Sequence, residues 1–147
     1  MTTIAWDGKQ LAADKQATYQ DKPYRCTKIA KRNGMLYGVA GYLSAMWPLI
    51  EWHVSGCDPD AWPCAARSDD KEDDDETVLL VIARDRILIY QAEPNPAILG
   101  VDQPFAIGSG QDYAMAAMKL GKSAADAVRV AAEIDCGTGC GVDTLLL

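Results

Sequence analysis

The sequence predicts an α+β fold, because strand hairpins come first, a helical segment and another hairpin follow, and two helices precede a short closing strand. The turns of the first two hairpins are marked by Asp7-Gly8 and Asn33-Gly34, dipeptides that suit the positive φ angles of a type I′ turn. With 147 residues, 49% of them hydrophobic, the chain can form one core. We therefore expect a single domain spanning residues 1–147.

The strands are expected where apolar residues run between turn signals. The expected pairs are residues 2–6 with 9–14, 27–32 with 35–40, and 78–83 with 86–90. The third pair is nearly continuous in apolar residues, which predicts strands covered on both faces. Residues 141–147 are the expected closing strand.

Two helices are expected late in the chain. The first opens at Ser109, with Asp112 three residues further on, and closes before Gly121, so it has a cap signal at each end. The second opens at Ser123 with Asp126 in its first turn. Its alanine and valine side chains are short, which favours close packing of the helix pair against a sheet.

A further helical stretch is expected at residues 43–53. It contains Pro48, so the helix is expected either to kink there or to begin afresh. His53, the one histidine of the sequence, lies near its end. No activated serine or cysteine can be identified beside it, which favours a structural role for this imidazole.

The net charge of −7 is concentrated in one segment. Residues 69–76 hold seven acidic residues and one lysine, and so carry a charge of −6. We expect an acidic loop at about residues 68–77, without the ligand spacing or central glycine of a calcium loop. The rest of the chain is nearly neutral and has no basic stripe, which argues against a nucleic-acid partner.

The cysteines and the hydropathy pattern limit the chemistry further. The five cysteines lack paired CxxC spacing, which favours reduced thiols over disulfides or a zinc site. We therefore expect no metal and no cofactor. No segment approaches the roughly 18 apolar residues of a membrane span, and the start of the chain does not resemble a signal peptide. The expected location is the cytoplasm, without membrane association.

Thr2 directly follows Met1 and is the first candidate for catalysis. If Met1 is removed, Thr2 carries a free α-amino group with a pKa of roughly 8. That amine can accept the proton of the adjacent hydroxyl, which is one known way of activating a threonine nucleophile. If Met1 is retained, the amine is blocked and the protein is inactive.

Five segments in order resemble the proteasome β-type N-terminal-nucleophile (Ntn) hydrolases, and most closely the bacterial HslV-like peptidases. They are Thr2-Thr3-Ile4, Leu11-Ala12-Ala13-Asp14, Thr27-Lys28-Ile29 running on to Gly38-Val39-Ala40-Gly41, Ala106-Ile107-Gly108-Ser109-Gly110, and Asp135-Cys136-Gly137-Thr138-Gly139. The resemblance implies a four-layer αββα sandwich of two antiparallel sheets flanked by helices. The region of residues 55–76 departs from the family pattern, so the fold is expected to be shortened in its middle.

The resemblance also implies a role for individual residues. Thr2 would be the nucleophile, Lys28 would lower the effective pKa of its hydroxyl, and Asp14 would orient that lysine. The backbone N–H of Gly41 would donate to the oxyanion. The remaining implied site residues are Ser109, Asp135 and Thr138 in a network around the amine, and Val39 in the substrate pocket.

The activity implied is that of a threonine endopeptidase acting on peptides or unfolded proteins. The family works in closed rings, which implies a homo-oligomer of about six or seven subunits, as one ring or two stacked rings. An unfolding ATPase is the candidate partner. Two alternatives remain open, a catalytically silent Ntn-fold assembly or binding protein that retains Met1, and a small-molecule amidase.

Overall fold

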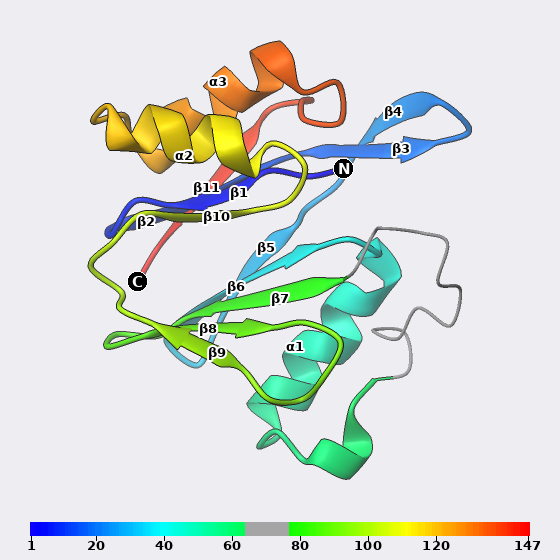
Figure 1. The fold of residues 1–147 in the computed structure, drawn as a ribbon. Coiled ribbons are helices and arrows are strands. Elements are labelled where there is room, and N and C mark those ends of the chain that lie inside the picture. The colour runs from blue at the N-terminus through cyan, green and yellow to red at the C-terminus, as the bar shows by residue number, and fades with distance from the viewer. Residues whose placement is uncertain (64–76) are drawn as a thin grey trace.

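The computed structural model describes residues 1–63 and 77–147. Within these residues all strands except those of one hairpin form two stacked antiparallel sheets, and helices cover both outer faces (Figure 1). The predicted α+β sandwich of two sheets flanked by helices is therefore confirmed. The helices in the described parts of the chain are all too short or too polar to cross a membrane.

The first sheet has four strands in the order β10-β1-β2-β11. Its members are β1 (Ile4–Trp6), β2 (Gln10–Asp14), β10 (Phe105–Ile107) and β11 (Val142–Leu146). The turn between β1 and β2 forms at the predicted place but not as type I′, because Gly8 has a φ of +96° whereas the φ of Asp7 is not positive. The Asp7 carboxylate accepts hydrogen bonds from the backbone N–H groups of Lys9 and Gln10, which holds the turn closed.

Two helices, α2 (Gln111–Lys119) and α3 (Ala124–Ile134), cover the outer face of the first sheet (Figure 1). The interface consists mostly of buried alanines from both layers, which lets the helices lie close to the strands. Helix α3 begins as predicted, because the Ser123 side chain accepts a hydrogen bond from Asp126 N–H. The predicted start of α2 is wrong, since its N-cap is Gly110 and no side chain caps it.

The second sheet has five strands in the order β5-β6-β7-β8-β9. They are β5 (Ile29–Arg32), β6 (Met35–Ala40), β7 (Val78–Ile82), β8 (Ile87–Tyr90) and β9 (Ala97–Leu99). Asn33 and Gly34 connect β5 to β6 with φ angles of 50° and 75°, as the type I′ prediction requires. The outer face of this sheet is covered by α1 (Met46–Val54).

Helix α1 follows a short 3-10 turn, η1 (Leu43–Ala45), and a second such turn, η2 (Pro59–Ala61), lies beyond it. Pro48 falls in the first turn of α1, where its missing N–H costs no helical hydrogen bond. The α-helix therefore begins at Met46, two residues before Pro48, and not at Pro48 itself.

Strand β6 contributes to two separate cores. Leu36 and Ala40 pack between the two sheets, whereas Tyr37 and Val39 pack beneath α1. This alternation follows from the two-residue period of a strand. It means that each side of the second sheet is buried, as the continuous apolar pattern of its strands predicted.

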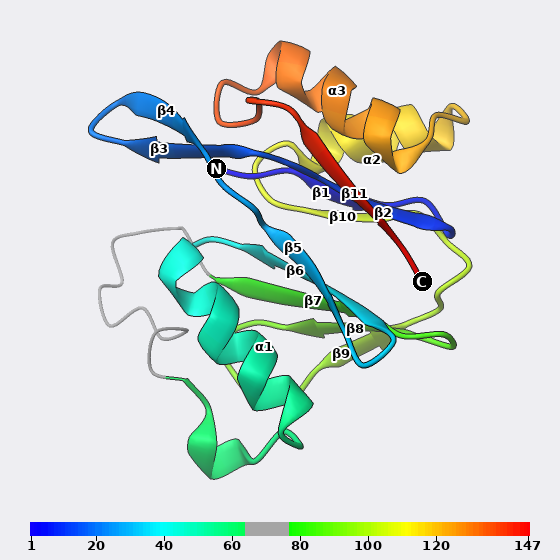
Figure 2. The ribbon, with the colours of Figure 1, turned by 180° about the vertical axis from the view of Figure 1, so that it is seen from behind.

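A hairpin that the sequence analysis did not predict projects beyond the first sheet (Figure 2). It consists of β3 (Gln16–Tyr19) and β4 (Lys22–Arg25). Its turn residues Gln20 and Asp21 have φ angles of 49° and 60° without a glycine, so the usual signal was missing. Apart from Thr77, the acidic loop expected at about residues 68–77 falls outside the described residues.

Candidate active site

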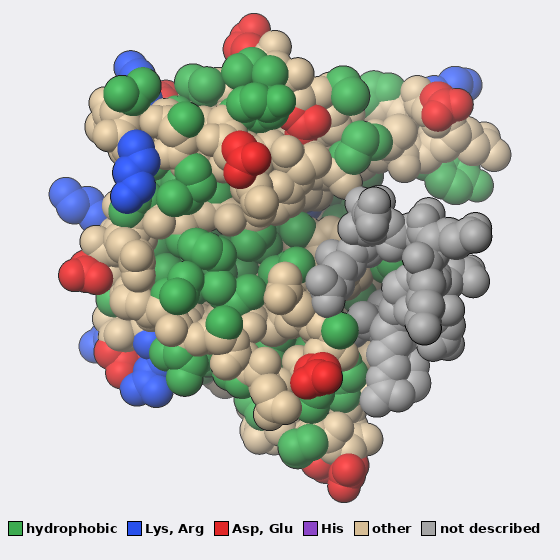
Figure 3. Space-filling model, viewed as in Figure 1, with side chains coloured by type: hydrophobic (Ala, Val, Ile, Leu, Met, Phe, Trp, Pro, Cys, Tyr) green, Lys and Arg blue, Asp and Glu red, His purple; other side chains and the backbone are tan. Residues whose placement is uncertain are grey.

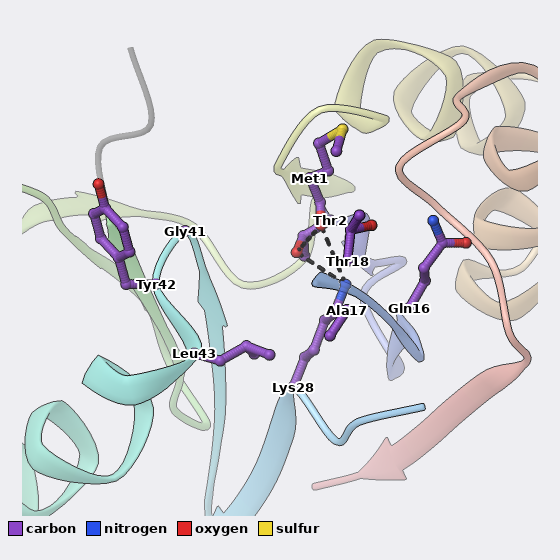
Figure 4. A pocket seen from close by; sticks show the side chains of 9 residues that line it. All are labelled: Met1, Thr2, Gln16, Ala17, Thr18, Lys28, Gly41, Tyr42 and Leu43. Atoms are coloured by element: carbon purple, nitrogen blue, oxygen red, sulfur yellow. Dashed lines mark hydrogen bonds between the residues drawn. The ribbon is translucent and has the colours of Figure 1, made fainter. Parts of the chain in front are cut away.

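Thr2 lies at the mouth of the two sheets, in a cavity of about 320 Å³. Figure 4 shows Gly41, Tyr42 and Leu43 on one side of Thr2, and Gln16, Ala17 and Thr18 on the other. The complete lining is Met1, Thr2, Gln16, Ala17, Thr18, Lys28, Gly41, Tyr42 and Leu43. The cavity is therefore built from the start of the chain, from β3 and from the segment that follows β6.

A lysine bridges the threonine hydroxyl and a buried carboxylate. Lys28 Nζ lies 3.0 Å from Thr2 Oγ1, and 2.9 and 3.1 Å from the two carboxylate oxygens of Asp14. The side chains of Lys28 and Asp14 are 1% and 0% exposed. In such a dry setting the field of the ammonium acts on the hydroxyl with little screening by water, and it favours loss of the hydroxyl proton.

Asp14 is held by the backbone as well as by Lys28. Its carboxylate accepts hydrogen bonds from the N–H groups of Thr3, Gln16 and Gly139, at 2.9, 3.0 and 3.2 Å. Burial of a charged group is tolerated when it is paired and hydrogen-bonded in this way. The position of Lys28 is thus fixed by a carboxylate that ties three segments of chain together.

A second network meets the backbone nitrogen of Thr2. Thr2 N–H donates to Ser109 Oγ at 3.1 Å, and the Ser109 hydroxyl donates to Asp135 Oδ2 at 2.6 Å. Thr138 Oγ1 donates to the same Asp135 oxygen, also at 2.6 Å, and lies 2.6 Å from Thr3 Oγ1. Ser109 is therefore aimed at the atom that becomes the α-amine if Met1 is removed.

The pKa of Asp135 reflects two opposing causes. Partial burial raises the pKa, but the hydrogen bonds donated by Ser109, Thr138 and Gly137 N–H outweigh it. The pKa of this carboxyl consequently lies below its ordinary value. Asp135 is ionised at neutral pH and can hold the Ser109 hydroxyl in one orientation.

Gly41 and Gly108 bring backbone close to Thr2. Gly41, with a φ of +103°, follows β6 and lines the cavity. Gly108, with a φ of +98°, has no room for a side chain, because a Cβ would collide with the Thr2 carbonyl oxygen. Only glycine suits both the conformation and the contact at this position.

The structure brings together most of the residues that the sequence analysis selected. Lys28 and Ser109 are hydrogen-bonded to Thr2, and Gly41 lines its cavity. Asp14 is hydrogen-bonded to Lys28, Asp135 to Ser109, and Thr138 to Asp135. Val39 is a correction, because its side chain is 1% exposed in the core beneath α1 and does not line the cavity. The alternation of β6 directs it away from Thr2.

His53 lies in the last turn of α1 and is half-buried. Its Nδ1 is 3.0 Å from the hydroxyl of Tyr37, and burial lowers the pKa of the imidazole. Its ring also contacts Tyr90 edge to face. Burial and these contacts support the structural interpretation of this residue.

Two contributors were missed by the sequence analysis as individual residues. Gln16 lines the cavity, and its side-chain amide donates to the carbonyl of Cys136 at 2.9 Å, which ties β3 to the Asp135 loop. Thr3 donates its backbone N–H to Asp14 and its hydroxyl contacts Thr138. In the sequence, only its position two residues after Asp14 marks Gln16 as a site residue, whereas Thr3 belongs to the motif Thr2-Thr3-Ile4.

The stacked sheets, the outer helices and a threonine at the mouth of the sheets define the fold of an Ntn hydrolase. No family model and no curated protein matches the sequence. Solved structures do match, and they confirm the resemblance to the HslV- and proteasome-like family at the level of the fold.

Three of these structures show how far the likeness extends. A BPH from Thiobacillus denitrificans, in complex with epoxomicin, matches with a TM-score of 0.71 and 19% identity over 99% of this chain and 97% of that one. HslV from Trypanosoma brucei gives 0.70 and 20% over 99% of both chains. An Anbu mutant from Hyphomicrobium sp. strain MC1 gives 0.70 and 17% over 100% of this chain and 82% of that one.

Proposed function

We propose that this chain is a threonine endopeptidase that cleaves peptide bonds by nucleophilic attack of Thr2, once Met1 has been removed. The observation that carries the proposal is the position of Lys28 Nζ, 3.0 Å from the Thr2 hydroxyl and 2.9 Å from Asp14. A buried lysine that bridges a carboxylate and a hydroxyl in a cavity has the geometry required to activate a nucleophile.

The proposed reaction is acyl transfer. The freed Thr2 amine accepts the hydroxyl proton while Thr2 Oγ1 bonds to the substrate carbonyl carbon, and the Gly41 N–H stabilises the oxyanion. The same proton then passes to the leaving amine as the C–N bond breaks. Water subsequently hydrolyses the ester and frees Thr2. Ser109 and Asp135 hold the amine in place throughout.

Met1 is the specific reason to keep a silent assembly protein as the second candidate. Its carbonyl oxygen accepts a hydrogen bond from Thr2 Oγ1 at 2.6 Å and lies 3.4 Å from Lys28 Nζ. A Cβ at Gly137 would collide with the Met1 side chain, although that side chain is 54% exposed. While Met1 is present, the Thr2 hydroxyl is hydrogen-bonded to the Met1 carbonyl, and the Thr2 nitrogen belongs to a peptide bond and is not a free amine.

The proposal is tested by intact mass and by labelling of Thr2. We expect purified protein to lack Met1 and to gain the mass of one peptidyl epoxyketone, an electrophile that captures both the hydroxyl and the amine. Thr2→Ala should abolish labelling, while the control Thr144→Ala, at an exposed position on β11, should not. A processed protein that remains unlabelled would refute the peptidase, and a protein that retains Met1 would favour the silent candidate.

We further propose that the protein acts in the cytoplasm as a closed ring of about six or seven subunits, single or stacked. The family resemblance supports this, as does the 51% exposure of Trp47 in α1. Peptides or unfolded proteins are the proposed substrates, with an unfolding ATPase as partner. Light scattering should give a mass several times 15.9 kDa, and a monomer at micromolar concentration would contradict the ring.

A further inference from the structure

Thr77 is a buried threonine that contacts the wall of the Thr2 cavity from the second sheet. It directly precedes β7 and is 3% exposed. Its Oγ1 accepts a hydrogen bond from the backbone N–H of Tyr42 at 3.2 Å. Tyr42 directly follows Gly41, and both residues line the cavity (Figure 4). A buried side chain thus holds the backbone that forms one wall of the cavity.

This hydrogen bond lies where the ladder between β6 and β7 ends. The last pair is Ala40 with Val78, and the same register continued by one residue sets Gly41 opposite Thr77. Gly41 leaves the strand conformation at this point, because its φ is +103°. The N–H of the following residue, Tyr42, is bonded to the Thr77 hydroxyl. That hydroxyl takes the place that a backbone carbonyl has along a ladder.

The strand next to Thr77 is fixed by packing. Val78 packs against the core between the two sheets, and hydrophobic side chains gather on the face of the molecule between α2 and the second sheet (Figure 3). Leu79 packs on the opposite side of the sheet, beneath α1. The two-residue period of a strand directs Thr77 to the same side as Leu79. The hydroxyl therefore lies on the side of the sheet where the chain leads from Gly41 into α1.

Tyr42 is held at its carbonyl as well as at its N–H. Its carbonyl oxygen accepts a hydrogen bond from the N–H of Ala45 at 3.0 Å, and Tyr42 is the N-cap residue of η1. Its N–H is held by Thr77. The peptide unit between Gly41 and Tyr42 is consequently anchored to β7 on one side and to η1 on the other.

We propose that Thr77 is a positioning residue for the oxyanion donor, because its bond to Tyr42 N–H fixes the orientation of Gly41. The inference rests on the proposed function, in which the Gly41 N–H stabilises the oxyanion. A glycine has more backbone conformations open to it than any other residue, so an unanchored Gly41 would turn its N–H in several directions. A donor stabilises an oxyanion only when it is already aimed at the position that the oxygen takes during attack.

Two substitutions separate the hydroxyl of Thr77 from its shape. Thr77→Val replaces the hydroxyl with a methyl group of similar size and leaves the Tyr42 N–H without its acceptor. Thr77→Ser keeps the hydroxyl and removes only the methyl group. A positioning role predicts a defect in the valine variant and rescue in the serine variant. A role in packing alone predicts the reverse, because valine preserves the packed shape and serine leaves a small cavity.

The first readout compares two electrophiles that share one peptide part, on protein that lacks Met1. With a peptidyl aldehyde, Thr2 Oγ1 bonds to the carbonyl carbon, the C=O π bond opens, and the hydroxyl proton passes through the Thr2 amine to the new oxygen, which occupies the oxyanion position. With a peptidyl vinyl sulfone, Oγ1 bonds to the alkene carbon, the C=C π bond opens, and the proton ends on the carbon beside the sulfone. No oxyanion forms at the attacked carbon in the second reaction.

The two electrophiles should therefore respond differently to the loss of the anchor. The dissociation constant of the aldehyde should rise roughly tenfold in Thr77→Val and stay unchanged in Thr77→Ser. The rate of vinyl sulfone labelling should be the same in all three proteins. Equal losses with both electrophiles would overturn the proposal, as would an unchanged aldehyde affinity in Thr77→Val. An unsubstituted protein that reacts with neither electrophile would refute the peptidase itself.

The second readout does not depend on any reaction at Thr2. Hydrogen–deuterium exchange, followed by mass spectrometry of peptides that contain Tyr42, should be roughly tenfold faster in Thr77→Val and unchanged in Thr77→Ser. Unchanged exchange in Thr77→Val would overturn the anchor even in an active enzyme. Faster exchange in a protein that reacts with neither electrophile would leave Thr77 as a structural anchor and would refute both its role in catalysis and the peptidase.

Discussion

Two hydrogen-bond networks approach Thr2 from different sides, and they differ in burial. The inner network, Asp14 and Lys28, is 0% and 1% exposed and contacts the hydroxyl. The outer network, Ser109, Asp135 and Thr138, contacts the nitrogen, and its carboxylate is only partly buried. The hydroxyl and the backbone nitrogen of Thr2 are thus contacted by networks with different access to water.

This difference in burial predicts how a substitution in each network affects stability and activity. In the inner network, removal of one member leaves a charge in a dry site, so stability and activity should change together. In the outer network, water can replace a lost hydrogen bond, so activity should change more than stability. Substitutions in each network can therefore test whether burial sets the contribution of a polar group to this site.

The largest effect is expected from Lys28→Met, compared with Lys15→Met. Lys28→Met should lower kcat by on the order of 10²–10⁴-fold, because the hydroxyl loses the ammonium that favours its deprotonation. The free energy of unfolding should decrease by an amount near the lower end of about 3–5 kcal/mol, because Asp14 keeps its three backbone donors. Peptide turnover and urea unfolding measure the two effects.

Lys15 is the matched control because it pairs with Asp143 at 2.7 Å in a site where the two side chains are 26% and 29% exposed. Lys15→Met should cost about 1 kcal/mol or less and leave turnover unchanged. If the two variants behaved alike, burial of the inner network would have no special consequence, and Lys28 would be a structural lysine.

A smaller effect is expected from Asp135→Asn. The amide is a weaker acceptor than the carboxylate, so Ser109 and Thr138 lose charge-assisted hydrogen bonds worth about 1.5–3 kcal/mol. If that energy acts wholly on the position of the amine, kcat falls by roughly ten- to hundredfold. Steady-state kinetics would show this, and a loss as large as that of Lys28→Met would erase the proposed difference between the networks.

The smallest effect concerns acid stability. The pKa of Asp135 is lower in the folded protein than its ordinary value of 3.8, so folding favours the ionised form. Its contribution to stability is therefore complete above pH 3.8 and is lost as the pH falls through the folded pKa. Urea midpoints of the unsubstituted protein and Asp135→Asn should differ at pH 7 and converge at lower pH. A gap that widens on acidification would contradict the direction of this shift.

Much of the fold could be predicted from local signals. Asp7-Gly8 and Asn33-Gly34 correctly marked two hairpins, but only Asn33-Gly34 has the two positive φ angles of the predicted type I′ turn. The hairpin at Gln20 and Asp21 was missed because non-glycine residues adopt the same conformation there. Strands β9 and β10 have three residues each, too few to show a period, and they exist because neighbouring strands pair with them.

The candidate site could be predicted only through the family resemblance. Asp14, Lys28 and Ser109 are far apart in the sequence, and no periodicity shows that they meet at Thr2. The role of Ser109 as an N-cap was wrong because its hydroxyl donates to Asp135, a tertiary contact that outweighs the local one. Alternation places Val39 on the same face as Tyr37, but only the structure shows that this face packs beneath α1.

The backbone donors of Asp14 also determine when the site can exist. The Gly139 N–H comes from a residue 125 positions beyond Asp14. A ribosome that adds about 5–20 residues per second needs roughly 6–25 seconds to cover that distance. Throughout that interval the carboxylate that anchors Lys28 lacks one of its donors, and the Thr138 hydroxyl of the outer network has not been made. The residues that surround Thr2 can therefore come together only after the segment between α3 and β11 has been made.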